Sequence, residues 1–326
     1  MEFEVIENPG KEWDDFAAKF SEMVFFRSVW GRVLAEGLGA RPYYCCLKEK
    51  GRIVGGAPGI IFKYWNLRLY YSCINYGGYI GEKRYAELFY TELLKLLKAH
   101  GTRADIAYIF PALFDSVAPD NVDLKREKTA ISYIDIESRP LAEIESAFKR
   151  GVRQSLRKAK KLGLEFRLCS DKESMSNAFS LYEEAMKRNR AVVKYPVKWF
   201  EAMHHLLIEK GLADLCMVFH NGTAIASVVA LYSNDGVHLL NNGSRTKSLH
   251  LRASDFMQHE IIKLGIAKQK NYIDFLHSSP DDHNLIRWKE KFGSRTEYRD
   301  NFTQVNGRLK YWGWNAAKKV YPLLAR

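Results

Sequence analysis

The chain has 326 residues, of which 47% are hydrophobic and 27% charged, so it is long enough for two domains and wholesale disorder is excluded. With 50 Lys and Arg against 38 Asp and Glu, its net charge of +12 favours anionic partners such as a nucleotide, a phosphorylated carrier, RNA or an anionic bilayer. The five cysteines lack CxxC spacing, which argues against a disulfide framework or a zinc knuckle. Because the N-terminus does not resemble a signal peptide and no apolar run approaches the roughly 20 residues that cross a bilayer, we expect a cytoplasmic protein.

The first half of the chain is predicted to be mixed α/β. Helical spacing of apolar residues is found in three segments: 11–20, 28–39 and 83–101. Strands are expected in a hairpin at 43–64, at 67–81, and in two short segments at 104–111 and 130–136.

The second half repeats this order of elements. Further helices are expected in four segments: 148–163, 173–189, 196–211 and 253–271. Single strands are expected at 165–170 and 271–276, and segment 213–244 reads as three more. These three are joined at Asn221–Gly222 and Asp235–Gly236, which are the strongest hairpin signals in the sequence.

Each half therefore reads as helices, an antiparallel meander, a helix and a returning strand, the order of an N-acyltransferase fold. We predict an α/β (α+β) protein with two tandem GNAT-like domains, each a mixed, mainly antiparallel sheet flanked by helices. The expected domains are 1–145 and 146–307. A last helix at 308–326 can pack back on the first domain.

The segment FKRGVRQSLRKAKKLG (148–163) contains no acidic residue. At about 100° per residue its cations gather on one side of the helix, and apolar residues occupy the other. A solvated surface would explain this pattern, but such surfaces usually mix charges of both signs. We therefore expect an anion here, either a phosphate or RNA, bound by Arg153 and Arg157.

The strand at 271–276 is followed by a polar loop, in which His277, Asp281 and His283 do not have the spacing of a metal site. We expect a capped loop without a metal, placed to line a site because ligands collect beyond the carboxyl ends of strands. In WKEKFG (288–293), Lys289 and Lys291 must point in different directions on a helix, so only one of them can enter a shared pocket.

Several short motifs occur together in a characteristic order. In the first half, Trp30 is followed by Arg32, then by GRIVGGAP and NYGGYIG; in the second, RKAKKLG precedes KYPVKWF, NNGS, DFL and WKEKFG. In this order the chain resembles the FemABX family of peptidoglycan-bridge aminoacyltransferases, from about residue 20 to residue 300.

The resemblance implies roles for particular residues. Arg32, and either Lys194 or Tyr195, match positions that contact the diphosphate of the acceptor. Lys289 matches a lysine near the reacting groups, and we expect it to be catalytic by stabilising the charge of the tetrahedral oxyanion. The same cleft would include three further substrate-binding residues: Ser244, Asp274 and Trp288. Phe110–Pro111 stands where the family often has an acidic residue before proline, which leaves the general base unassigned.

The implied function is transfer of an acyl or aminoacyl group, which forms an amide on an amine carried by a nucleotide- or lipid-linked precursor of the cell envelope or a polysaccharide. Aminoacyl-tRNA is the expected donor and acyl-CoA the alternative, with no tightly bound cofactor. The expected partners are an anionic precursor and tRNA but not DNA, and peripheral contact with the inner membrane face is left open. A non-catalytic RNA- or membrane-binding protein of the same fold is the second alternative.

Overall fold

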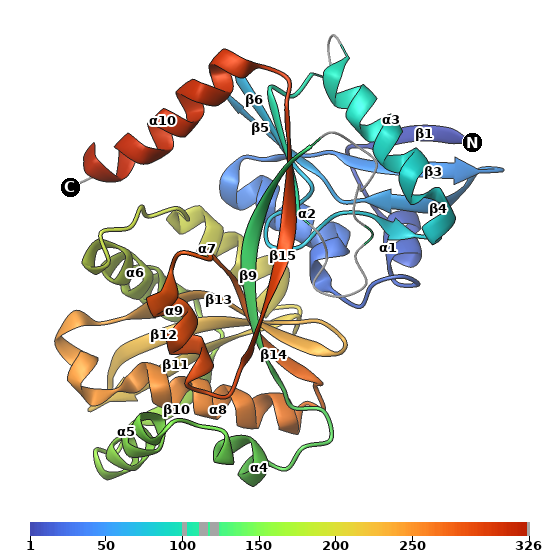
Figure 1. Cartoon of the computed structure of the whole chain (residues 1–326). Helices are drawn as coiled ribbons and strands as arrows, with labels where there is room; N and C mark the ends of the chain where they lie inside the picture. The colour runs from blue at the N-terminus through green and yellow to red at the C-terminus, as the bar shows by residue number, and fades with distance from the viewer. Residues whose placement is uncertain (100–102, 111–116, 118–123, 325–326) are drawn as a thin grey trace. The chain divides into compact units, whose positions relative to one another are not determined.

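The computed structural model describes residues 1–99, 103–110, 117 and 124–324 (Figure 1). Spatial contacts divide the chain into two compact units, which we describe separately: unit 1 comprises residues 1–129 and 299–325, and unit 2 comprises residues 130–298. The chain enters unit 2 within β9 (Lys125–Asp135) and returns to unit 1 within β15 (Arg295–Val305). The divisions at 129/130 and 298/299 differ from the expected ones at 145/146 and 307/308, because both crossings lie inside long strands.

Unit 1 contains two groups of hydrogen-bonded strands. The first has the order β1-β3-β4-β7: Glu2–Ile6, Tyr44–Glu49, Arg52–Ala57 and Ile80–Gly81. In the second, β15 is followed by β8, β6, β5 and β2: Ile106–Ile109, Leu67–Tyr71, Ile60–Tyr64 and Arg41–Pro42. Its helices are α1, α2, α3 and α10: Lys11–Ala17, Ser28–Leu38, Ala86–Lys98 and Arg308–Leu324.

The core of unit 1 is rich in aromatic residues. The side chains of Phe89, Leu93 and Leu97 recur at helical spacing along α3 and are fully buried. The terminal helix α10 contacts this unit, since the Nζ of Lys310 lies 3.0 Å from a carboxylate oxygen of Asp105. Pro111 lies outside the described residues.

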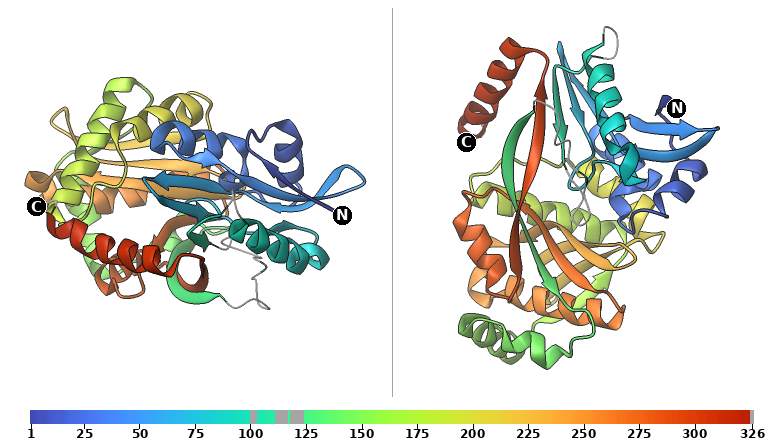
Figure 2. Two further views of the ribbon diagram at one scale, coloured as in Figure 1. Left: turned by 90° about the horizontal axis from the view of Figure 1, so that it is seen from above. Right: turned by 45° about the vertical axis from the view of Figure 1, so that its right-hand side comes forward.

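Unit 2 contains one group of hydrogen-bonded strands, in the order β10-β11-β12-β13-β14-β9. Strands β10 to β14 are Glu165–Cys169, Ala213–His220, Thr223–Tyr232, Gly236–Ser244 and Tyr272–Ser278. Helices α4 to α9 are Leu141–Ser146, Arg150–Lys161, Lys172–Arg188, Val197–Met203, Ala253–Ala267 and His283–Glu290. Figures 1 and 2 show α6 and α7 on one face of this sheet and α8 on the other.

Local chemistry explains the meander β11–β12–β13. Asn221 and Gly222 both have positive φ, 50° and 73°, as a two-residue type I′ hairpin turn requires. All strand pairs of the meander are antiparallel, whereas β13 and β14 run parallel, with α8 as the connection. The predicted mixed, mainly antiparallel sheet flanked by helices is confirmed.

In the described part of the chain, no helix has both the length and the apolar character that a membrane crossing demands.

Candidate functional site

The parallel strands β13 and β14 separate soon after they begin. They share three residue pairs, Gly236–Tyr272, Val237–Ile273 and His238–Asp274. Beyond the third pair, β13 stays with β12 as far as Ser244, and β14 stays with β9 as far as Ser278. The carboxyl halves of the two strands thus lie apart, at the position where open α/β sheets bind a ligand.

A bulge occurs in each strand just beyond this point. In β13, two residues, Asn241 and Asn242, lie opposite the single Val228 of β12, and Asn241 has φ 55°. In β14 the register with β9 shifts between Asp274 and His277, and Leu276 has φ 57°. Non-glycine residues rarely adopt this conformation, and bulges of this kind redirect backbone groups near functional sites.

A chain of buried polar groups links β13 and β14 at the point where the two strands separate. The Nδ1 of His238 lies 2.7 Å from Oδ2 of Asp274, and its Nε2 lies 2.8 Å from Oγ of Ser233; both His238 and Asp274 are 0% exposed. The other carboxylate oxygen of Asp274 accepts a hydrogen bond from the backbone N–H of Leu276 at 2.8 Å. The left-handed conformation of Leu276 is therefore fixed by a buried carboxylate.

Lys289 completes this network. Its Nζ donates to the carbonyl oxygen of Leu276 at 2.8 Å and to Oγ of Ser278 at 2.7 Å, and the residue is only 3% exposed. Burial lowers the pKa of Lys289 to about 8, although the carboxylates of Asp274 and Asp282 act in the opposite direction. A buried lysine with such a pKa is a candidate for a functional role.

Aromatic packing holds α9 in place. The ring of Trp288 meets those of Phe275 and Phe292 edge to face, with centroids 6.0 and 5.4 Å apart. The helix is capped at its N-terminus by Asp282, whose side chain accepts a hydrogen bond from the N–H of Leu285. On the other side of the helix, Lys291 pairs with Asp255 at 2.5 Å, so Lys289 and Lys291 do point in different directions.

The other predicted residues of unit 2 fall on three elements. Tyr195 stacks on Trp199 of α7. The indole N–H of Trp199 donates a hydrogen bond to Oδ1 of Asn241 in the β13 bulge at 2.9 Å. Lys194, next to Tyr195 in the sequence, is exposed. Ser244, at the end of β13, is buried.

Ser244 accepts hydrogen bonds from Arg188 with both its carbonyl and its hydroxyl oxygen. Arg153 and Arg157 are exposed on α5, and Arg32 is exposed on α2 of unit 1. The network thus links Asp274 to Lys289 through the backbone of Leu276, and Trp288 precedes Lys289 on α9. Among the described residues of unit 2, no hydrogen bond links Arg153 or Arg157 to this network.

Two residues of the network, Ser233 and His238, were not identified as site residues from the sequence alone. The available signal was a histidine inside an otherwise apolar strand, but its partner Asp274 becomes evident only once the register of β13 and β14 is known.

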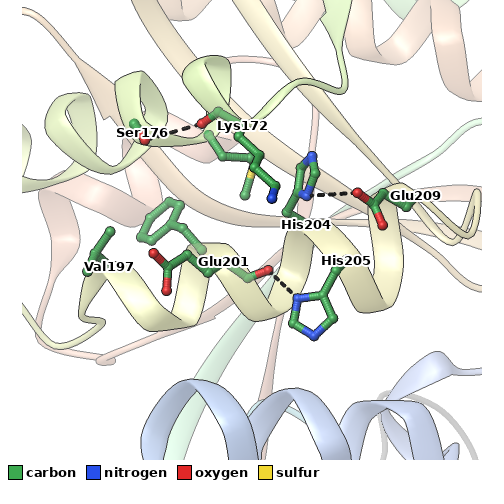
Figure 3. Close-up of a pocket in the computed structure, with 9 residues that line it drawn as sticks. Lys172, Ser176, Val197, Glu201, His204, His205 and Glu209 are labelled. Atoms are coloured by element: carbon green, nitrogen blue, oxygen red, sulfur yellow. Dashed lines mark hydrogen bonds and ion pairs between the residues drawn. The ribbon is translucent and has the colours of Figure 1, made fainter.

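A separate cavity of about 510 Å³ lies between α6 and α7 (Figure 3). Its two histidines are engaged locally: Nε2 of His204 lies 2.7 Å from the Ser170 carbonyl oxygen, and Nδ1 of His205 lies 2.8 Å from that of Glu201. The described residues contain no cluster that could hold a metal ion. We therefore place the candidate site at β13 and β14 and not in this cavity.

Comparison with known proteins relates unit 2 to a family of known fold. Residues 146–290 match the family described as "Acetyltransferase (GNAT) domain", a segment that includes β13, β14 and Lys289. Most of unit 2 is thus similar to an acetyltransferase (GNAT) domain. No match was found among curated protein sequences.

The whole chain has the fold of FemX. The crystal structure of FemX superposes with a TM-score of 0.73 at 15% identity, covering 96% of this chain and 99% of FemX. A tandem GNAT protein from the clavulanic acid biosynthesis pathway gives a TM-score of 0.60 at 11% identity, covering 94% and 98% of the two chains. The C-terminal domain of a putative lysylphosphatidylglycerol synthetase from Agrobacterium fabrum gives 0.60 at 11% identity, covering 94% and 95%. The FemABX-like, tandem GNAT fold predicted from the sequence is thereby confirmed.

Proposed function

We propose that this protein transfers an acyl or aminoacyl group to an amine, and that the reaction takes place in unit 2 where β13 and β14 separate. One observation carries the proposal. A buried lysine, Lys289, is held by two hydrogen bonds at the end of β14, within the segment that matches an acyltransferase family.

The reaction needs little covalent chemistry from the protein. The amine nitrogen of the acceptor attacks the carbonyl carbon of the donor, the carbon–oxygen or carbon–sulfur bond breaks, and the amine proton leaves to water or to the leaving group. A protonated Lys289 has three N–H groups, of which Leu276 and Ser278 accept two. The third remains to stabilise the negative charge on the tetrahedral oxygen.

The buried network gives this lysine a fixed position. His238 and Leu276 N–H hold the Asp274 carboxylate from two sides, which sets the direction of the Leu276 carbonyl that binds Lys289. Asp274 and His238 are therefore positioning residues and not catalytic ones, because they act through Lys289.

The donor can be an aminoacyl-tRNA or an acyl-CoA. The FemX-like fold supports the first, and the acetyltransferase description of the matched family supports the second. A pyrophosphate at a helix N-terminus is often bound by a glycine-rich loop, but residues 244–252 before α8 contain no glycine. We therefore favour aminoacyl-tRNA.

For the acceptor we propose an amine on a phosphate-bearing precursor, nucleotide- or lipid-linked, of the cell envelope or a polysaccharide. The net charge of +12 and the exposed Lys194 of unit 2 support an anionic acceptor.

The experiment is to incubate the full-length protein with labelled aminoacyl-tRNAs and, separately, labelled acyl-CoAs, each with amine acceptors that carry a diphosphate. We expect label to move to the acceptor from one donor class and to remain on the donor when protein is omitted. Binding of donor without transfer to any amine would contradict the proposal and favour a non-catalytic binding protein of the same fold.

A further inference from the structure

A second concave surface lies in unit 2, between α5 and α8, with a volume of about 620 Å³. Its floor is apolar and includes Phe148, Leu156 and Phe256. One wall is cationic, with Arg153, Arg157 and Lys160. None of these residues takes part in the network around Lys289.

The acidic residues of this groove do not neutralise its cationic wall. Glu145 lies 2.6 Å from Nε2 of His259, and Glu260 pairs with Lys263 at 2.8 Å. The guanidinium of Arg153 instead donates to the carbonyl oxygen of Phe148 at 2.7 Å. Among the described residues, no carboxylate pairs with Arg153, Arg157 or Lys160, so the groove offers uncompensated positive charge to an anion.

The groove is part of a wider basic face. This face includes two exposed leucines, Leu162 and Leu249. Its other members are the exposed cations of α5 and its N-cap residue: Lys149, Arg150, Arg153, Arg157, Lys158, Lys160 and Lys161. The apolar side of α5 is already used, because Val152 and Ala159 are buried in the core. The two leucines are 36% and 44% exposed, and Leu249 precedes His250, whose carbonyl oxygen lies 2.7 Å from Nζ of Lys158.

We propose that the basic face docks unit 2 on an anionic phospholipid bilayer, with one lipid phosphate seated in the groove. Clustered lysines and arginines bind anionic lipid surfaces, and exposed leucines beside them can enter the interfacial region. Recognition of single-stranded RNA would instead favour exposed aromatic rings on which bases stack, but Phe148 is buried and Phe256 is half-buried. The inference goes beyond the proposed transfer reaction and does not depend on it.

The test is sedimentation of the full-length protein with phosphatidylcholine vesicles and with vesicles that also contain phosphatidylglycerol. The variant Arg153→Gln/Arg157→Gln/Lys160→Gln removes the cationic wall. The matched control, Lys172→Gln/Lys198→Gln/Lys210→Gln, removes three exposed cations elsewhere on unit 2. A second variant, Leu162→Ser/Leu249→Ser, removes the exposed leucines, and thermal unfolding verifies that all variants are folded.

We expect binding only to the anionic vesicles, a loss of at least about tenfold in partitioning for the groove variant, and a smaller loss for the control. The leucine variant should also bind more weakly. Equal losses in the groove variant and the control would reduce the effect to net charge and overturn the proposal. It would equally be overturned if the groove variant lost binding to tRNA or single-stranded RNA but not to vesicles, or if soluble glycerophosphate bound as tightly as the lipid.

Discussion

Among single residues, Lys289 is central to the proposed transfer reaction. It is buried, it has two hydrogen-bond acceptors, and its pKa of about 8 means that its charge changes near physiological pH. Such a lysine can act as an ammonium that stabilises an oxyanion or as a neutral amine that removes a proton. The two roles predict opposite dependences on pH.

The first prediction concerns the rate of transfer. Because the proposed role of Lys289 requires its ammonium form, kcat/KM should fall as the pH rises through about 8, where Lys289 loses its proton. The carboxylate of Asp274 raises this pKa, so Asp274→Asn should move the falling limb to lower pH. A pH–rate profile of both proteins measures this, and a rate that rises through pH 8 would assign Lys289 to proton removal.

The same pKa predicts a dependence of stability on pH. In the unfolded chain the pKa of Lys289 is near 10.5, so between about pH 8 and 10.5 the unfolded state binds more protons than the folded state. In this window the unfolding free energy should rise with pH by up to about 3 kcal/mol more in the native protein than in Lys289→Met. Urea unfolding of both proteins across this range is the measurement, and parallel pH dependences would contradict it.

The sequence was informative about some of these residues and not others. Trp288 and Lys289 belong to one local motif, so their place on a helix beside the loop after the 271–276 strand could be predicted from the sequence. The left-handed Leu276 and the His238–Asp274 pair could not, because they depend on a bulge and on the register between two strands 36 residues apart.

At the scale of elements, the bulge in β13 depends on close packing against α6. A Cβ on Gly243 would lie 2.5 Å from the backbone nitrogen of Tyr182 and 2.6 Å from the carbonyl carbon of Leu181. Glycine is therefore required for β13 and α6 to approach each other at the site.

Gly243→Ala should lower the unfolding free energy by about 1–3 kcal/mol, since backbone atoms would have to move, and should slow transfer by displacing the bulge. Gly151→Ala in α5 is the matched control, because a Cβ there meets nothing within 4 Å. Removing glycine from a helix should stabilise the protein by up to about 1 kcal/mol. Chemical denaturation compares the two variants, and equal stabilities would contradict the packing argument.

Elements with a clear periodicity were predictable, and those with a mixed pattern were not. The hairpins of the β11–β13 meander follow from Asn–Gly and Asp–Gly turns at the expected positions. Strand β15 was missed because its sequence, RTEYRDNFTQV, is polar over most of its length and only Phe302–Gln304 are buried. Its place in the fold is decided by long-range pairing.

At the scale of the whole molecule, the chain crosses between its units twice, so unit 1 is made of two separate segments. The returning segment completes unit 1: Phe302 pairs with Ile109 of β8, and the Asn306 side chain donates to the carbonyl oxygens of Leu97 and Ala104. No local pattern in a sequence reveals such a discontinuous unit, which is why the predicted boundaries differ from the observed division.

Truncation after residue 298 should therefore unfold unit 1 while unit 2 keeps its core. Amide hydrogen exchange should rise sharply in β6 and β8 and stay slow in β11 and β12. Truncation after residue 307 is the matched control, because it removes α10 but keeps the β15 pairs with β8. Equal exchange in the two truncated proteins would show that β15 is dispensable for unit 1.

The most direct test of the account is the single-turnover rate of acyl transfer by Lys289→Ala and by Arg287→Ala, with the donor that the native protein uses. Both substitutions lie on α9, but Arg287 is exposed, whereas Lys289 is buried against the end of β14. Loss of one oxyanion donor predicts a fall of roughly 10²–10³-fold for Lys289→Ala, with Arg287→Ala close to the native rate. A folded Lys289→Ala protein that transfers at the native rate would contradict the account.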